Sequence, residues 1–107
     1  MADRSLPHIQ IDVPYEQVAD FCRRNHIRKL SLFGSVLRDD FNDESDVDVL
    51  VEFQFGAKVG LFDLARMARE LSSLFHRQVD LLTPGFLSLQ FRKAVLEGAE
   101  TIYEKAS

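Results

Sequence analysis

The segment Asp46-Val47-Asp48-Val49-Leu50-Val51-Glu52-Phe53 constrains this chain more than any other part of its sequence. Valine or phenylalanine stands at every second position, which predicts a β-strand over 47–53 with one apolar face. Asp46, Asp48, Leu50 and Glu52 fall on the opposite face. We therefore expect a sheet that is buried on one side and carries carboxylates on the other.

Helical and strand periods alternate along the rest of the chain. Helical spacing of apolar residues predicts helices from Pro14 to about Asn25 and over 61–75, and Thr83-Pro84 predicts the start of a last helix that ends near Gly98. Short apolar runs predict strands over 27–33 and 79–82, with 101–103 as a candidate edge strand. A brief helical turn or loop is expected from Val36 to about Phe41. This order predicts an α+β (mixed α/β) domain with a small mixed sheet, whose helices pack on the face opposite the carboxylates.

Length and composition favour a single domain over 1–107, with an N-terminal extension at 1–13 and a short tail at 104–107. The chain has 107 residues, of which 46% are hydrophobic, and one cysteine, Cys22, which we expect in the core. It has no signal-like segment and no apolar run that could span a bilayer, which favours the cytoplasm. A net charge of −4 argues against direct nucleic-acid binding, because phosphates are usually met by a basic face.

Most of the phenylalanines are expected in the core. The expected core set is Phe53, Phe55, Phe62, Phe75, Phe86 and Phe91. Phe55 and Phe86 could instead belong to an interface with a partner.

Three carboxylates suggest metal-assisted phosphoryl transfer. Asp46 and Asp48 are two residues apart on a strand, with Cα atoms roughly 6.6 Å apart, and Asp80 lies in the later strand. If the two strands pair, at a spacing of about 4.8 Å, Asp80 can supply a third ligand. Such oxygen ligands suit Mg²⁺, and two ions about 3.5–4 Å apart can assist an in-line displacement at phosphorus. Glu52 lies about 13 Å beyond Asp48 along the strand, too far to share the ions.

The Gly34-Ser35 turn can supply the complementary phosphate contacts. Glycine lets the backbone approach a phosphate, and the Ser35 hydroxyl and the following amides can donate to phosphate oxygens. The turn is not a Walker A loop, because no Gly-Lys-Ser/Thr follows it. Arg38 is a candidate to bind the triphosphate or the leaving pyrophosphate, and an ion pair with Asp39 or Asp43 is the alternative.

Taken singly, these motifs are weak. Asp46 and Asp48 follow an acidic stretch and could begin a solvated strand, and Asp80 could face solvent on an edge strand. Their joint spacing is more specific: Leu32-Phe33-Gly34-Ser35 is separated by ten residues from Asp46-Val47-Asp48.

This joint pattern resembles the MNT-type minimal nucleotidyltransferases of the DNA polymerase β-like superfamily, and the resemblance covers most of the chain. It implies the minimal nucleotidyltransferase fold and a site in which Asp46, Asp48 and Asp80 hold two Mg²⁺ while Gly34 and Ser35 grip the triphosphate of ATP. Val36-Leu37 and Asn42 depart from the commonest pattern in the spacer, and neither change removes a ligand.

Many stand-alone members of this size resemble antitoxins encoded beside a HEPN-domain ribonuclease toxin. The resemblance implies a protein adenylyltransferase that transfers AMP from ATP to a tyrosine of the toxin and so neutralises it, with Asp80 as the natural general base. We expect the toxin to complete the acceptor site, because the chain has no residues left for an acceptor-binding domain. Two alternatives stay open: an antitoxin that blocks its toxin by binding alone, and a nucleotidyltransferase acting on a small molecule or an RNA end.

Overall fold

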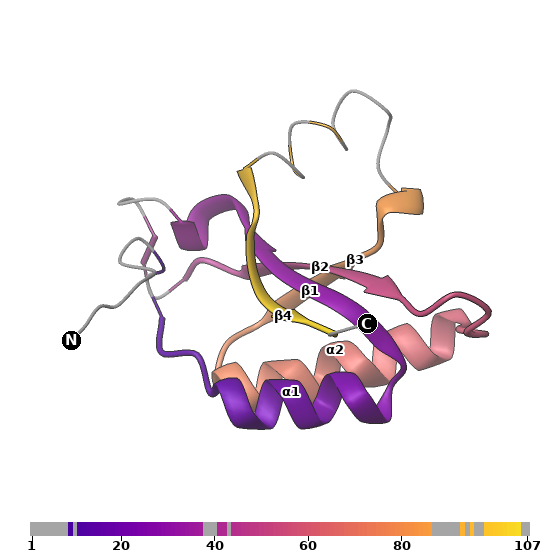
Figure 1. Ribbon diagram of the computed structural model, residues 1–107. Helices are drawn as coiled ribbons and strands as arrows, with labels where there is room; N and C mark the ends of the chain where they lie inside the picture. Colours follow the sequence, from indigo (N-terminus) through magenta and orange to yellow (C-terminus); the bar gives the residue numbers. More distant parts are fainter. Residues whose placement is uncertain are drawn as a thin grey trace.

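The computed structural model describes residues 9, 11–37, 41–42, 44–86, 93, 95 and 98–105, and within these residues it forms a four-stranded sheet in the order β3-β2-β1-β4 (Figure 1). The strands are β1 (Ile27–Phe33), β2 (Val47–Phe53), β3 (Val79–Leu82) and β4 (Glu100–Glu104). β1 pairs antiparallel with both β2 and β4, whereas β2 and β3 are parallel. The sheet is therefore mixed, as the sequence predicts.

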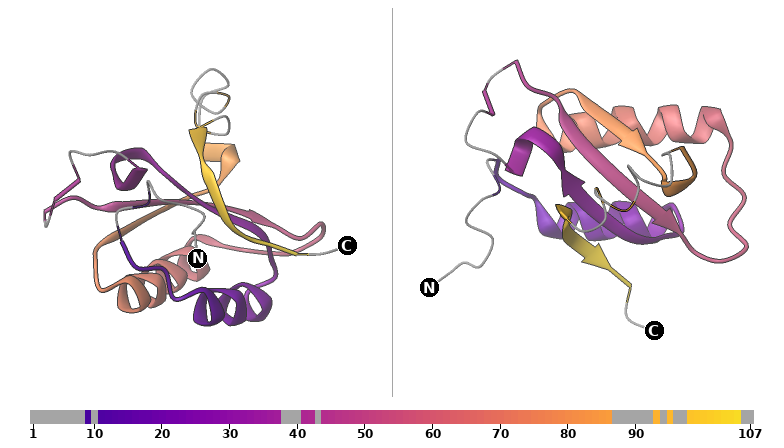
Figure 2. Two further views of the ribbon diagram at one scale, coloured as in Figure 1. Left: turned by 60° about the vertical axis from the view of Figure 1, so that its left-hand side comes forward. Right: turned by 90° about the horizontal axis from the view of Figure 1, so that it is seen from above.

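Two helices, α1 (Tyr15–Arg24) and α2 (Leu61–Phe75), cover one face of the sheet. The left view of Figure 2 shows both helices beneath the strands. The alternating valines of β2 point toward them, and Val47, Val49 and Val51 are fully buried in the main core. The helix side of this core is formed by Val18, Phe21, Cys22, Met67, Leu71 and Phe75. Burial of the valine face against α1 and α2 confirms the expected placement of these two helices.

The ends of the helices follow from local hydrogen bonds. The Asn25 side chain donates to the Phe21 carbonyl over 2.8 Å where α1 ends. At the start of α2, the Asp63 carboxylate accepts a hydrogen bond of 2.9 Å from the Gly60 amide, as in a capping interaction. α2 ends at His76, which takes a left-handed conformation with φ of 57°. Both helices lie within a residue or so of their predicted bounds.

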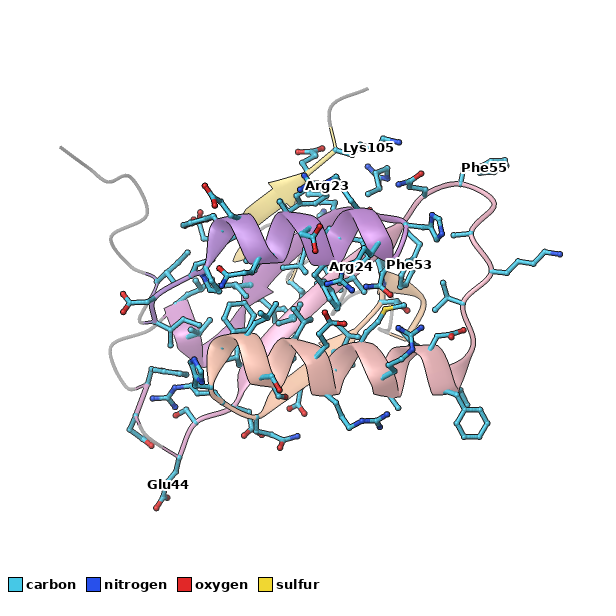
Figure 3. The ribbon with its side chains drawn as sticks, turned by 90° about the horizontal axis from the view of Figure 1, so that it is seen from below. Arg23, Arg24, Glu44, Phe53, Phe55 and Lys105 are labelled. Atoms are coloured by element: carbon cyan, nitrogen blue, oxygen red, sulfur yellow. The ribbon has the colours of Figure 1, made fainter. Side chains whose placement is uncertain are left out.

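Two apolar residues at the start of α2 are exposed, and one of them, Phe62, departs from the prediction that it is core. The exposed fraction is 74% for Leu61 and 93% for Phe62. Figure 1 shows the reason: the first turn of α2 lies beyond the end of β2, next to the connecting loop rather than over the sheet. Phe55 in that loop is also fully exposed, and its side chain points away from the molecule in Figure 3.

A smaller apolar cluster lies on the carboxylate face. Phe33, Leu50 and Val95 are buried together, with Leu82 and Ala99 packed against them. Val95 belongs to the segment expected to form the last helix, most of which lies outside the described residues; a 3₁₀ turn, η2 (Pro84–Phe86), follows β3. The placement of Val95 differs from the expectation that every helix covers the opposite face.

Hydrogen bonding to the sheet continues past the end of β4. The Lys105 amide donates to the Arg28 carbonyl over 2.8 Å, so the pairing of β4 with β1 extends into the expected tail. The expected N-terminal extension lies mostly outside the described residues. Within the described residues, no helix combines the length and the apolar composition that crossing a bilayer requires.

Candidate active site

Asp48 and Asp80 are direct neighbours across the two parallel strands β2 and β3. Their Cα atoms are register partners, and two residues further along Leu50 pairs with Leu82. Because side chains alternate along a strand, Asp48 shares a face with Leu50 and Asp80 with Leu82. Leu50 belongs to the second apolar cluster, and Leu82 packs against this cluster. The two carboxylates therefore lie side by side on the face away from α1 and α2, which confirms that their strands pair.

The turn after β1 brings Gly34 against Asp48. Gly34 has φ of 79° and begins η1 (Gly34–Leu37), a short 3₁₀ turn. A Cβ atom at this position would overlap the Asp48 Oδ2 atom and lie 3.3 Å from Asp48 Cγ. Phe33, the preceding residue, is the register partner of Asp48. The Gly-Ser turn and the second aspartate of the sequence pattern are thus in direct contact.

Asp46 lies just before β2, so strand alternation does not fix the direction of its exposed side chain. It lines a shallow surface pocket formed by the segment before β2 and the turn before β3. The other lining residues are Glu44, Ser45, His76, Arg77 and Gln78. Glu52 is on the same face as Asp48 but at the far end of β2, where it forms an ion pair of 2.5 Å with Arg28. The exclusion of Glu52 from the site agrees with this geometry.

The carboxylate oxygens are of the chemical type that binds a divalent cation. Asp48 and Asp80 offer adjacent hard oxygen donors of the kind that Mg²⁺ prefers, and Gly34 leaves the space in which Asp48 Oδ2 lies. Within the described part of the chain, however, no three side chains of His, Cys, Asp or Glu stand close enough together to hold a metal ion. The joint use of Asp46, Asp48 and Asp80 as ligands stays a prediction.

Two of the predicted nucleotide contacts lie outside the described part of the structure. They are Arg38 and the side chain of Ser35, although the Ser35 backbone belongs to η1. Arg77, by contrast, lines the pocket beside Asp46 and does not appear among the residues that the sequence singles out. Arg77 belongs to no motif in the sequence, and its place shortly before the strand of Asp80 is the one feature that could have drawn attention to it.

Residues 15–102 match the family described as nucleotidyltransferase domain. The protein MJ0435 of Methanocaldococcus jannaschii, a candidate protein adenylyltransferase, is 38% identical to this chain over 60 residues, which make up 56% of this chain. That match spans 62% of MJ0435, less than two thirds of its length. The protein adenylyltransferase MntA of Thermococcus cleftensis is 31% identical over 77 residues, covering 72% of this chain and 74% of MntA.

Solved structures share the fold. A crystal structure of a toxin–antitoxin with AMP-PNP aligns with a TM-score of 0.71 at 19% identity, over 87% of this chain and 75% of that chain. A chain from the structure of a tri-AMPylated Shewanella oneidensis HEPN toxin in complex with MNT antitoxin aligns with a TM-score of 0.58 at 18% identity, over 85% of this chain and 70% of that chain. At these identities the likeness shows a common fold.

Proposed function

This chain belongs to the nucleotidyltransferase domain family, as one of its minimal, MNT-type members, and from this premise we propose that it is an antitoxin that acts as a protein adenylyltransferase. It takes ATP as substrate and transfers AMP to a tyrosine of a HEPN-type ribonuclease toxin, which is thereby neutralised. The observation that carries the proposal is the contact of Gly34 with Asp48 and the pairing of Asp48 with Asp80.

The reaction is an in-line displacement at the α-phosphorus of ATP. The tyrosine oxygen forms a bond to this phosphorus while the bond to the oxygen that bridges it to the β-phosphate breaks, and pyrophosphate leaves. Asp80 accepts the proton of the tyrosine hydroxyl as general base. Its position supports this role, because Asp80 is exposed on β3, an outer strand of the described sheet, where a side chain of another protein can approach it.

The remaining residues bind the nucleotide. Asp46, Asp48 and Asp80 would hold two Mg²⁺ ions, which would supply positive charge to the phosphate oxygens and lower the pKa of the attacking hydroxyl. The positive φ of Gly34 and its lack of a side chain bring the turn against Asp48, so a triphosphate bound at the turn would lie beside this carboxylate. Ser35 and Arg38 complete this part of the proposal as donors to the phosphate oxygens.

Two observations support a protein as acceptor. The protein adenylyltransferase MntA is a relative that covers most of this chain, and a structure with the same fold is an antitoxin bound to a HEPN toxin that carries AMP groups. The chain is also acidic, with a net charge of −4, which disfavours a nucleic-acid acceptor. We place the reaction in the cytoplasm, where ATP and the RNA substrate of the toxin meet.

The test is co-expression with the copurifying toxin, followed by intact mass of the toxin after incubation with ATP and Mg²⁺. We expect a shift by one or more AMP units, and loss of this shift in Asp46→Asn and in Asp48→Asn with the fold retained. Glu52→Gln is the matched control, because Glu52 is a carboxylate on the same face of β2 but far from Gly34. It should transfer AMP at the wild-type rate.

The same experiment separates transfer from occlusion. An antitoxin that acts by binding alone would hold and silence the toxin without any change in mass, and its Asp48→Asn variant would inhibit as well as the wild type. Full transfer by both Asp46→Asn and Asp48→Asn would rule out the proposed site.

A further inference from the structure

Arg77 connects the turn before β3 to the segment that leads into Asp46. Its Nη1 atom donates to the Asn42 carbonyl over 2.9 Å and to the Ser45 carbonyl over 3.1 Å. Its guanidinium carbon also lies 4.4 Å from the centre of the Phe41 ring. A single half-buried side chain thus contacts three residues of the segment 41–46.

Asn42 forms hydrogen bonds with Glu44 and Ser45 in a turn before Asp46. The Ser45 amide donates to the Asn42 carbonyl over 3.0 Å, and the Asn42 amide donates to the Ser45 hydroxyl over 3.1 Å. The Asn42 side-chain oxygen accepts from the Glu44 amide over 2.8 Å. The Asn42 carbonyl also accepts from Arg77, so the arginine binds the same oxygen that accepts from the Ser45 amide within the turn.

These contacts hold the backbone on both sides of Asp46. The peptide group before Asp46 carries the Ser45 carbonyl, which accepts from Arg77. The peptide group after Asp46 carries the Val47 amide, which donates to the carbonyl of Gln78 over 2.9 Å. Two consecutive residues of the turn before β3 therefore fix both peptide groups that flank Asp46.

Arg77 is itself held by the end of α2. Its amide donates to the Ser72 carbonyl over 3.2 Å, and the Ser72 hydroxyl accepts from the Val79 amide over 3.0 Å. A guanidinium presents several donors in a planar fork and can stack on an aromatic ring, whereas an ammonium group lacks the fork. The position therefore uses properties that are specific to arginine.

We propose that Arg77 is a positioning residue for the adenylylation site: it fixes Phe41, Asn42 and Ser45 and so the backbone of Asp46, next to the strand that carries Asp80. This inference rests on the proposed function, because Asp46 matters for catalysis only if the chain transfers a nucleotide. It goes beyond the carboxylates and the Gly-Ser turn, to which Arg77 does not belong.

The test compares Arg77→Met, which keeps an unbranched apolar stem and removes the guanidinium, with Arg69→Met. Arg69 is an exposed arginine of α2, so its loss changes the net charge equally. In the metal-free proteins, NMR measures hydrogen exchange at the amides of Ser45 and Val47. In the complex with toxin, the rate of AMP transfer is measured against Mg²⁺ concentration.

In Arg77→Met we expect exchange at these two amides to accelerate about 10-fold, the effect of losing one net hydrogen bond. We expect the half-saturating Mg²⁺ concentration to rise about 10-fold or more, the usual effect of removing a group that orients a ligand. Partial unfolding alone would lower the maximal rate and leave half-saturation in place. Arg69→Met should match the wild type in both measurements.

Wild-type exchange and wild-type half-saturation in Arg77→Met would overturn the proposal. If the wild-type protein transfers no AMP, the proposed function fails, and the exchange data still decide whether Arg77 fixes the segment. If Arg77→Met does not fold, Arg77→Lys serves instead, because it keeps the charge and lacks the fork. For Arg77→Lys we expect a smaller change in the same direction, and wild-type values would again overturn the proposal.

Discussion

The side chain of Asp48 fills the space that a β-carbon would occupy at Gly34, so the two motifs of the sequence pattern are in direct contact. Gly34 has a positive φ of 79°, which an L-residue with a side chain rarely adopts. Conformation and contact therefore require glycine here for two independent reasons. The Gly-Ser turn and the carboxylates form one structural unit, although ten residues separate Ser35 from Asp46.

The first prediction uses the substitution Gly34→Ala. Left-handed backbone costs about 1–2 kcal/mol for alanine, and the new methyl group must also displace the Asp48 carboxylate. We expect the free energy of unfolding to fall by at least this amount in chemical denaturation. AMP transfer should fall by about 100-fold, the effect of moving a catalytic group by about 1 Å.

Gly56→Ala is the matched control for this prediction. Gly56 also has a positive φ, of 86°, but nothing lies within 4 Å of an added Cβ atom. It should lose stability through backbone strain alone and keep full transfer. Equal activity in the two variants would contradict the role that we give to the contact between Gly34 and Asp48.

The strands could be predicted from the sequence because their signals are local. The alternating valines of β2 and the glycine after Phe33 fix the bounds of two strands, and both agree with the structure. The pairing of Asp48 with Asp80 depends on the crossover through α2, which periodicity alone only makes plausible. The sequence predicts this pairing only as a condition for a shared site, and the structure confirms it.

Other features could not be predicted, because they depend on where one element ends relative to another. Leu61 keeps the helical spacing of a core residue, but 74% of it is exposed. Arg77 binds backbone carbonyls more than thirty residues away in the sequence, and no pattern of side chains encodes such a contact. Asp46 precedes its strand, so alternation leaves its direction open.

A second prediction follows from the exposure of Phe62. Phe62→Ser should change the free energy of unfolding by less than about 0.5 kcal/mol, as is usual for surface substitutions. Phe21 is fully buried in the core, and Phe21→Ala should lower the free energy of unfolding by about 3–5 kcal/mol. Urea denaturation measures both variants, and a large loss in Phe62→Ser would show that the start of α2 packs against the sheet.

The third prediction concerns Arg24, which links α1 to α2. Arg24, which lies between the two helices in Figure 3, donates to Glu70 over 2.6 Å and to Asp20 over 2.9 Å. These two carboxylates, Glu70 first, raise the pKa of its guanidinium. About half of the Arg24 side chain is exposed, so water and salt weaken both pairs. We expect Arg24→Met to lose less than about 1 kcal/mol.

Denaturation at low and high salt checks this prediction, with Arg23→Met as the control because Arg23 is an exposed neighbour on the same helix. The difference between the two variants should shrink as the salt concentration rises. A loss above about 2 kcal/mol that salt does not change would be outside the range of exposed ion pairs.

The fourth prediction concerns the chemistry of Cys22. This residue is fully buried in the main core, and burial raises the pKa of its thiol from 9.0 to about 12. Because the thiolate is the reactive form, a thiol-modifying reagent should label Cys22 only when the protein opens. Labelling followed by mass spectrometry should be slow in buffer and rapid in denaturant, and rapid labelling of the folded protein would contradict the buried position.

The same shift makes stability depend on pH in one direction. The folded state keeps the Cys22 proton to higher pH than the unfolded state, so the contribution of this group is complete below about pH 9 and is lost as pH rises toward about 12. Cys22→Ala retains every other ionisable group of the chain, so a comparison with the wild type isolates the thiol. The free energy of unfolding should therefore fall more steeply with pH in the wild type than in Cys22→Ala above pH 9. Parallel curves would mean that the folded and unfolded thiols share one pKa.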